Sequence, residues 1–219
     1  MTRIAASILS ADFANLEKDL ESITSSDLIH VDVMDGHFVP NLTIGLPVVT
    51  RLQEVSKVPL DVHLMIDNPD RWAPMYADTG AFSVTFHFEA CAKVAETINS
   101  VRNSGSKVGL ALKPGTELKE VESFLSDIDM LLIMMVEPGF GGQSLMESVI
   151  PKISEAKTLA RDTVPNLSIQ VDGGIKSSNI EKLAEAGADT FVAGQSIMSA
   201  SDRNAEIALL RELAQASAS

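Results

Sequence analysis

A histidine and an aspartate interrupt an apolar segment near the start of this chain. The segment Leu28–Val33 consists mostly of strand-forming residues, and His30 and Asp32 lie two positions apart within it. Side chains two apart on a strand point the same way, so an imidazole and a carboxylate project together from a segment that is expected to be buried. A buried carboxylate is costly unless it is paired or binds a metal. An isolated pair of this kind is more often a structural hydrogen bond than a site.

Two later strand-like segments also end in a candidate metal ligand. His63 lies near the end of Leu60–Leu64, and Asp172 follows Ser168–Val171. Two imidazoles and two carboxylates suit Zn2+, Fe2+, Mn2+ or Co2+, provided that the fold brings the strand ends together. Four protein ligands would close a tetrahedral site, so we expect the coordination shell to expand when substrate binds.

Glycine-rich segments form a second group of candidate binding elements. They are Gly139-Phe140-Gly141-Gly142, Gly173-Gly174 and Gly194-Gln195. A single glycine-rich loop is usually a tight turn, but three such loops on one face of a barrel favour a phosphate site. Because the formal net charge is −13, a phosphate would have to be held by local dipoles such as backbone N–H groups. The first segment is also suited to close over a ligand as a lid.

Several other side chains near strand ends have two interpretations each. Ser7 either binds a substrate hydroxyl or caps a helix, although Ser10 or Asp12 is better placed for capping. Asp61 either orients a ligating histidine or makes an ordinary polar contact. His87 is expected to have a structural or orienting role. The strand ends also carry three methionines that either fill the core or surround the reacting carbons, namely Met34, Met65 and Met134.

The chain contains eight strand-like runs, each followed by residues at helical spacing. The runs are Ile4–Ser7, Leu28–Val33, Leu60–Leu64, Phe82–His87, Lys107–Leu112, Met130–Val136, Ser168–Val171 and Thr190–Ala193. This alternation predicts a (β/α)8 barrel, in which the C-terminal strand ends and the loops after them build the active site. The alternative is an open doubly wound sheet. It is disfavoured because no G-x-G-x-x-G motif opens a helix after the first strand.

Helical stripes follow the strands at spacings of three and four residues. After the first strand the stripe is Phe13, Leu16, Leu20 and Ile23, and after the fifth it is Leu118, Val121 and Leu125. The Ala/Ser tail at 214–219 is expected to be frayed.

Composition restricts the class of protein. The chain has 219 residues, 45% of them hydrophobic and 21% charged, and we expect one globular domain over residues 1–219. Its net charge of −13 argues against nucleic acid or an anionic membrane as a partner. No apolar run is long enough to span a bilayer, no signal peptide is evident, and Cys91 is the only cysteine. We therefore expect a cytoplasmic protein without an intrachain disulfide.

Five segments together resemble the ribulose-phosphate 3-epimerase family over nearly the whole chain. They are 7–12 (SILSAD), 30–41 (HVDVMDGHFVPN), 63–65 (HLM), 136–143 (VEPGFGGQ) and 171–175 (VDGGI). The resemblance implies a (β/α)8 fold and interconversion of D-ribulose 5-phosphate and D-xylulose 5-phosphate. It implies one divalent metal ion, with zinc as the first choice and iron, manganese or cobalt as alternatives. It also implies a homo-oligomer, a dimer or a hexamer.

The same resemblance assigns roles to individual residues. It implies four metal ligands, which are His30, Asp32, His63 and Asp172. Asp32 and Asp172 are also the two acid–base groups. The implied substrate contacts are Ser7, His63, Gly139, Phe140, Gly141, Gly142, Asp172, Gly173, Gly174, Gly194 and Gln195.

The implied reaction explains why two carboxylates are needed. Inverting a carbon next to a ketone requires proton removal on one face and proton delivery on the other, which one base does not easily do. The intermediate is an ene-diolate, whose developing charge a divalent ion stabilises.

The chain departs from the family pattern at two positions. The last loop usually reads Gly-Ser-Ala but here carries Gln195, so a backbone donor survives and a hydroxyl contact does not. Leu145 stands where a Phe is usual, which is expected to loosen the lid.

Other activities remain to be separated from this one. An epimerase of a six-carbon ketose phosphate such as allulose 6-phosphate would share every motif. A decarboxylase on a similar barrel would need a D-x-K-x-x-D array, which is absent. A Schiff-base aldolase would need a lysine at a strand end, and the only candidate, Lys113, adjoins a Pro-Gly turn. A non-catalytic sugar-phosphate binding protein would not need two acid–base aspartates.

Overall fold

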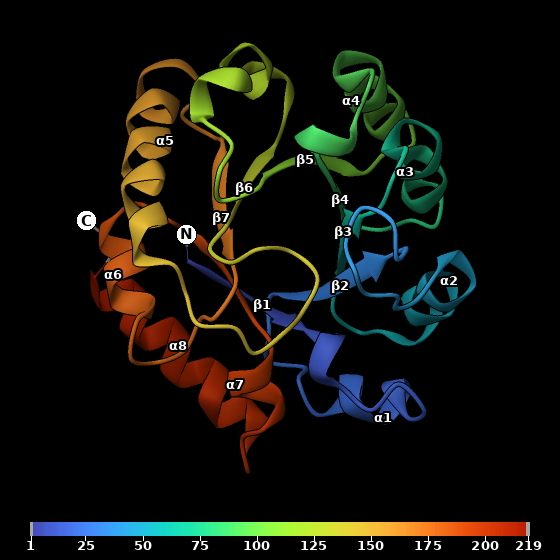
Figure 1. Cartoon of the computed structure of the whole chain (residues 1–219). Coiled ribbons are helices and arrows are strands. Elements are labelled where there is room, and N and C mark those ends of the chain that lie inside the picture. The colour runs from blue at the N-terminus through green and yellow to red at the C-terminus, as the bar shows by residue number, and fades with distance from the viewer. Residues whose placement is uncertain (1, 218–219) are drawn as a thin grey trace.

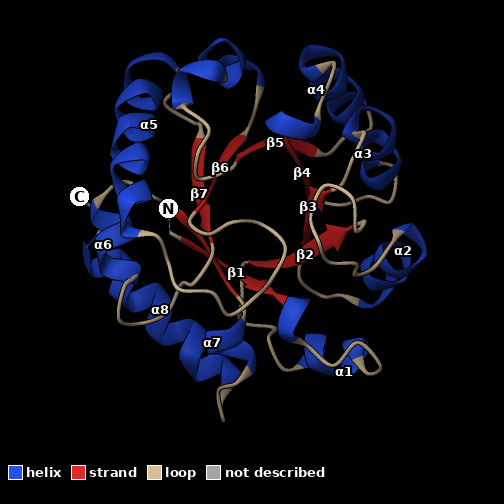
Figure 2. Ribbon diagram, in the orientation of Figure 1, coloured by secondary structure: helices blue, strands red, loops and turns tan. Residues whose placement is uncertain are grey.

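The predicted barrel is confirmed by the structure, a computed structural model that describes residues 2–217 except for the side chains of residues 162 and 163. Eight parallel strands close in the order β1-β2-β3-β4-β5-β6-β7-β8. The strands form a central ring and the helices surround it (Figures 1 and 2). Among the described residues, no helix is long and apolar enough to cross a membrane.

The strand bounds agree with the predicted runs to within one or two residues. The strands are β1 (Arg3–Ser7), β2 (Leu28–Met34), β3 (Leu60–Met65), β4 (Ser83–His87), β5 (Lys107–Leu112), β6 (Met130–Met134), β7 (Ser168–Asp172) and β8 (Thr190–Ala193). The α-helices are α1 (Leu16–Glu21), α2 (Leu46–Val55), α3 (Pro69–Ala77), α4 (Val94–Asn103), α5 (Ile150–Thr163), α6 (Ile180–Glu185), α7 (Gln195–Met198) and α8 (Arg203–Ser217). Short 3-10 helices are η1 (Ile8–Ser10), η2 (Phe88–Ala90), η3 (Leu118–Glu120), η4 (Glu122–Asp127) and η5 (Glu147–Val149).

The two faces of each strand have different chemistry. Apolar side chains such as Val31 and Val62 join the large core between the strands and the surrounding helices. The alternate positions face the barrel interior, where polar residues are common. Register pairs His30 with Asp61, and Asp32 with His63, on the neighbouring strands β2 and β3. The hydrophobic core therefore lies mainly outside the ring of strands, and the polar interior is available for a site.

Two of the predicted helices differ from expectation. The stripe after β1 does not form one helix, because α1 begins only at Leu16 and Phe13 is 44% exposed. Asp12 accepts hydrogen bonds from the Ala14 backbone and the Asn15 side chain, which hold residues 12–15 in a turn. The segment after β5 forms 3-10 helices η3 and η4 instead of an α-helix, although its three predicted apolar residues are all buried.

The predicted end of the sixth strand and the predicted start of the frayed tail were also wrong. β6 ends at Met134, where pairing with β7 stops opposite Asp172, so Val136 lies in the following loop. The tail is not frayed as far as Ser217, because α8 continues to that residue and Ala214 is fully buried. Residues 218 and 219 lie outside the described part of the chain.

The loop between β6 and α5 crosses the mouth of the barrel, as the yellow segment in Figure 1 shows. Its base is closed by a hydrogen bond from the Met146 backbone to Met135, 2.8 Å. Within the loop, the Gln143 amide donates to the carbonyls of Glu137 and Phe140 at 2.8 and 2.9 Å. These contacts give the glycine-rich segment a defined position over the site.

Candidate active site

Four side chains predicted as metal ligands meet at the C-terminal end of the barrel. One ligand atom from each of His30, Asp32, His63 and Asp172 lies within 4.8 Å of all the others. The two histidines are completely buried, and the carboxylates are 5% and 16% exposed. The cluster draws on β2, β3 and β7, so closure of the barrel is what brings it together.

The distances within the cluster fit a divalent ion of zinc size. The atoms His30 Nε2, His63 Nδ1 and Asp32 Oδ1 are 3.3–3.4 Å apart. Asp172 Oδ2 lies 3.8 and 3.7 Å from the two imidazole nitrogens. Tetrahedral coordination at zinc–ligand distances near 2.0–2.1 Å places the ligand atoms about 3.3–3.4 Å apart. The described residues can therefore hold such an ion with only a small movement of Asp172.

A buried carboxylate orients the first histidine. His30 Nδ1 lies 2.7 Å from Asp61 Oδ2, and Asp61 is completely buried. Ser83 and Gln170 also donate to Asp61, at 2.6 and 2.7 Å. Burial opposes the negative charge of Asp61, but the charge of His30 and these hydrogen bonds keep the pKa of Asp61 below its ordinary value. Asp61 therefore has the orienting position that was one of its two predicted roles, and it leaves His30 Nε2 facing the cluster.

The second histidine is contacted by another imidazole. His63 Nε2 lies 3.0 Å from His87 Nε2, and His87 Nδ1 lies 3.1 Å from Glu89 Oε2. Burial lowers the pKa of His87 to about 4, so its ring is neutral at pH 7. Burial opposes ionisation of Glu89, but hydrogen bonds from His87 and Thr116 lower its pKa to about 2. His87 therefore has the orienting position that was one of its two predicted roles.

The two aspartates of the cluster differ in their surroundings. Asp32 accepts a hydrogen bond from the Ser7 hydroxyl at 2.7 Å. Burial would raise the pKa of Asp32, but the charge of His30 and a hydrogen bond from His30 lower it far below its ordinary value. Burial and the neighbouring Asp32 carboxylate raise the pKa of Asp172 to about 7. Asp32 is thus held as a carboxylate, whereas Asp172 accepts and releases a proton near neutral pH.

The cluster opens into a pocket of about 640 Å³. Polar walls come from the strand ends and the glycine loops, and apolar walls come from methionine side chains. The lining includes Ser7, Asp32, Met34, Met65, Met134, Gly139, Phe140, Gly141, Gly142, Asp172, Gly173, Gly174, Gly194 and Gln195. The structure therefore brings every predicted substrate contact except the buried His63 to one pocket, and His63 lies behind Asp32, 3.4 Å away.

The β6–α5 loop, which lines the pocket, is joined to a second loop. The Asn41 side chain donates to the Gly139 carbonyl at 2.8 Å, which links the β2–α2 loop to the β6–α5 loop. Asp35 holds the first of these loops by accepting from the backbones of His37, Phe38 and Asp67. Phe140 is 54% exposed, so the tip of the second loop has an apolar side chain open to solvent.

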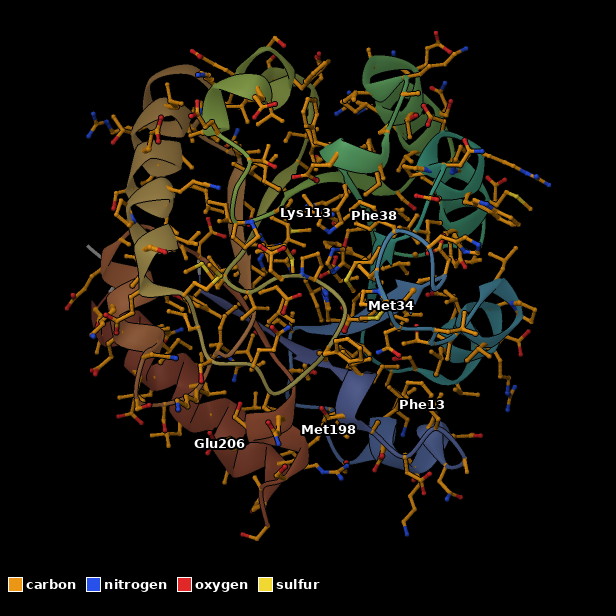
Figure 3. The ribbon with its side chains drawn as sticks, in the orientation of Figure 1. Phe13, Met34, Phe38, Lys113, Met198 and Glu206 are labelled. Carbon is orange, nitrogen blue, oxygen red and sulfur yellow. The ribbon has the colours of Figure 1, made fainter. Side chains whose placement is uncertain are left out.

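Two further side chains with alternative roles, Ser7 and Lys113, have defined surroundings. Ser7 itself caps η1, because its hydroxyl accepts from the Leu9 backbone at 3.2 Å. The expectation that Ser10 or Asp12 was better placed for capping was therefore wrong at this helix. Lys113 lies in the loop after β5, and its ammonium group lies 4.0 Å from the centre of the Phe38 ring. Figure 3 shows these two side chains close together.

Sequence reasoning missed two residues of this region. Glu89 was not singled out, although the H-x-E pattern that begins at the last residue of β4 resembles the H-x-D pattern at His30. Lys176 lines the pocket, and its place in the loop after Gly173-Gly174, where barrels often bind phosphate, could have drawn attention to it.

Comparison with known proteins points to one family. The family model described as "Ribulose-phosphate 3 epimerase family" matches residues 3–198. The chain is 50% identical over 213 residues to "Ribulose-phosphate 3-epimerase" of Mycobacterium leprae, covering 97% of this chain and 95% of that protein. It is 44% identical over 214 residues to "Ribulose-phosphate 3-epimerase" of Bacillus subtilis, covering 96% and 99%.

A similar fold is also found at low sequence identity. The crystal structure of KGPDC from Streptococcus mutans superposes with a TM-score of 0.74 at 14% identity, covering 99% of this chain and 98% of that one. This similarity concerns the fold alone.

Proposed function

Because the chain belongs to the ribulose-phosphate 3-epimerase family, we propose that it interconverts D-ribulose 5-phosphate and D-xylulose 5-phosphate by inverting carbon 3. The observation that carries the proposal is the convergence of Asp32 and Asp172 with two buried histidines at one pocket. Binding a sugar phosphate alone would need no such pair of acid–base groups.

The two aspartates are the proposed acid and base. They come from β2 and β7, which are separated in the barrel by β8 and β1, so they approach a substrate carbon from different sides. One carboxylate removes the proton from carbon 3 and the other delivers a proton to the opposite face. The reverse reaction exchanges their roles.

His30, Asp32, His63 and Asp172 are the proposed ligands of one divalent ion, with zinc as the first choice. Two nitrogen and two oxygen donors at these separations suit zinc. A divalent ion supplies positive charge that offsets the negative charge developing on the substrate oxygens. Iron, manganese and cobalt accept the same donor set.

The remaining pocket residues are assigned to substrate binding. We assign Ser7 to a substrate hydroxyl and the three methionines to the apolar wall that excludes water from the reacting carbons. The phosphate is assigned to the loops after β7 and β8, which include Gly173, Gly174, Gly194 and Gln195, as is common in barrels. We assign the loop segment 139–142 to a lid over the bound sugar.

Some expectations from sequence stay predictions. They are that residues 1–219 form one catalytic domain, that the protein works in the cytoplasm and that it assembles into a homo-oligomer. The net charge of −13 supports the further prediction that neither nucleic acid nor an anionic membrane is a partner.

The proposed substrate is tested by comparing ketose phosphates of five and six carbons. The zinc-loaded protein should epimerise D-ribulose 5-phosphate with a much higher kcat/KM than allulose 6-phosphate. The same protein treated with a chelator should lose this activity and regain it with zinc. A preference for allulose 6-phosphate would keep the reaction type and change the substrate. No turnover of either compound by folded, zinc-loaded protein would contradict the proposal.

A further inference from the structure

A row of contacts leads away from the candidate metal site. His63 has one nitrogen, Nδ1, facing Asp32 and Asp172 at 3.4 and 3.7 Å, and its other nitrogen lies 3.0 Å from His87. His87 continues the row to Glu89 at 3.1 Å. Both histidine side chains are completely buried, and the Glu89 side chain is 20% exposed. No bulk water replaces these contacts at either histidine.

The hydrogen bonds of Glu89, at the outer end of the row, have a fixed direction of donation. Glu89 Oε1 accepts from the Lys113 backbone N–H at 2.7 Å and from the Thr116 hydroxyl. Glu89 Oε2 is the atom that faces His87. An ionised carboxylate only accepts hydrogen bonds, so His87 must carry its hydrogen on Nδ1.

The hydrogen position on His87 also determines which nitrogen of His63 carries a hydrogen. A neutral imidazole with its hydrogen on Nδ1 has a lone pair on Nε2. Two ring nitrogens 3.0 Å apart form a hydrogen bond only when one carries a hydrogen and the other a lone pair. Because His87 Nε2 has the lone pair, His63 Nε2 must carry the hydrogen. His63 Nδ1 is then left with the lone pair that a metal ion requires.

We propose that Glu89 is a positioning residue that acts through His87 to hold His63 in the tautomer with its hydrogen on Nε2. The inference rests on the proposed metal site. Each histidine of that site is then oriented by a carboxylate. Asp61 contacts His30 directly, and Glu89 acts on His63 through the His87 ring.

The surroundings hold the row in place. The Phe38 ring lies 4.9 Å from the His87 ring, centre to centre, and the Lys113 ammonium group lies 4.0 Å from the centre of the Phe38 ring (Figure 3). The Lys152 ammonium group donates to the carbonyls of Lys113 and Thr116, at 3.3 and 2.6 Å. Lys152 thereby fixes the loop that supplies both donors to Glu89 Oε1.

The variant Glu89→Gln tests the proposal because it keeps the shape of the side chain but replaces the acceptor that faces His87 by a donor. The backbone N–H of Lys113 still requires an acceptor, so the amide oxygen faces Lys113 and the NH2 group faces His87. His87 Nδ1 would then have to accept, and its hydrogen would move to Nε2. His63 would in turn carry its hydrogen on Nδ1, where the metal ion binds.

The tautomers are read from two-bond 15N–1H correlation spectra of metal-free protein labelled at histidine. The chain has only four histidines, so the spectra are simple. The expected wild-type result is a hydrogen on Nε2 of His63 and on Nδ1 of His87. In Glu89→Gln both hydrogens should change place, and zinc affinity measured by chelator competition should fall roughly 10- to 100-fold.

Glu117→Gln is the matched control, since Glu117 lies in the same loop region with its side chain 65% exposed and does not contact His87. It should leave the tautomers and the zinc affinity as in the wild type. A wild-type His63 with its hydrogen on Nδ1 would overturn the proposal even if the variant failed to fold. Unchanged tautomers and zinc affinity in folded Glu89→Gln would also overturn it. Neither readout depends on epimerase turnover, so loss of the proposed function would be recognised separately.

Discussion

His30 donates its Nδ1 hydrogen to Asp61 across 2.7 Å in the closed interior of the barrel. Asp61 is an acceptor only, because its pKa is held below its ordinary value, so the direction of this hydrogen bond is fixed. The ring nitrogen that faces Asp32 and Asp172 is therefore Nε2. One pair of residues on neighbouring strands thus decides which atom His30 offers to a metal ion.

Replacing Asp61 by Asn should weaken zinc binding roughly 10- to 100-fold, because the negative charge that supports His30 is lost. The amide oxygen can still accept from His30 if the NH2 group turns to Ser83, so the fold should be retained. Ser83→Ala is the control, since it removes a different contact of Asp61 and should change zinc affinity much less. Chelator competition measures both variants. Equal zinc affinity in Asp61→Asn and wild type would show that Asp61 does not support His30.

Asp32→Asn and Asp172→Asn should each abolish turnover, because neither face of the substrate carbon can do without its acid–base group. General acid–base catalysis alone contributes roughly 10²- to 10⁴-fold to the rate, and loss of a metal ligand adds to this. The measurement is kcat with D-ribulose 5-phosphate, with zinc content determined on the same samples. Asp78→Asn, an exposed aspartate beyond the end of α3, is the control and should keep wild-type kcat. Near-wild-type activity in either site variant would contradict the two-base scheme.

Zinc affinity should rise with pH between about pH 5.5 and pH 7, where the raised pKa of Asp172, about 7, leaves its carboxyl protonated. Zinc must displace that proton, so lowering the pH opposes binding by about tenfold per pH unit for each proton displaced. His30 contributes in the same direction: burial lowers its pKa, but the charges of Asp32 and Asp61 raise it well above its ordinary value. Calorimetry in buffers of different ionisation enthalpy counts the protons released. Asp172→Asn should release fewer protons, and an affinity independent of pH over this range would contradict the assignment.

Gly174→Ala should disturb the loop over the pocket. Gly174 has φ +67°, and an added Cβ would lie 2.7 Å from the Gln143 carbonyl and from the Leu145 backbone nitrogen. Gly105→Ala is the control, since Gly105 has φ +92° with no atom within 4 Å of the added Cβ and lies between α4 and β5.

Both alanine variants should lose about 1–2 kcal/mol of unfolding free energy from the positive φ. Only Gly174→Ala should also lower kcat/KM, because only there must the backbone of the β6–α5 loop move. Denaturant unfolding and steady-state kinetics separate the two effects. Full activity in Gly174→Ala would mean that the loop position does not matter for turnover.

The fold was predictable from the sequence because eight apolar, strand-like runs alternate with residues at helical spacing. Helix bounds were predicted less well where side chains bind the backbone locally. Asp12 and Asn15 delay the start of α1, and Leu118 and Val121, three residues apart, lie in and beside the 3-10 helix η3. No periodicity distinguishes such a turn from the first turn of an α-helix.

The metal-binding candidates were predictable because His30, Asp32, His63 and Asp172 are polar residues in apolar strands, and barrel closure brings strand ends together. Glu89 was not predictable in the same way. Its contacts to Lys113 and Thr116 lie 24 and 27 residues away in sequence, and they depend on how two loops meet. The separation of the pKa values of Asp32 and Asp172 likewise depends on burial and distance, which sequence does not provide.

Proton exchange at carbon 3 tests the central claim most directly. The zinc-loaded protein is incubated with D-ribulose 5-phosphate in D2O, and the products are followed by NMR. Two acid–base groups that exchange protons with solvent predict D-xylulose 5-phosphate carrying deuterium at carbon 3, with Asp32→Asn and Asp172→Asn forming none. Formation of D-xylulose 5-phosphate without deuterium at carbon 3, or no reaction by folded and zinc-loaded protein, would contradict the account.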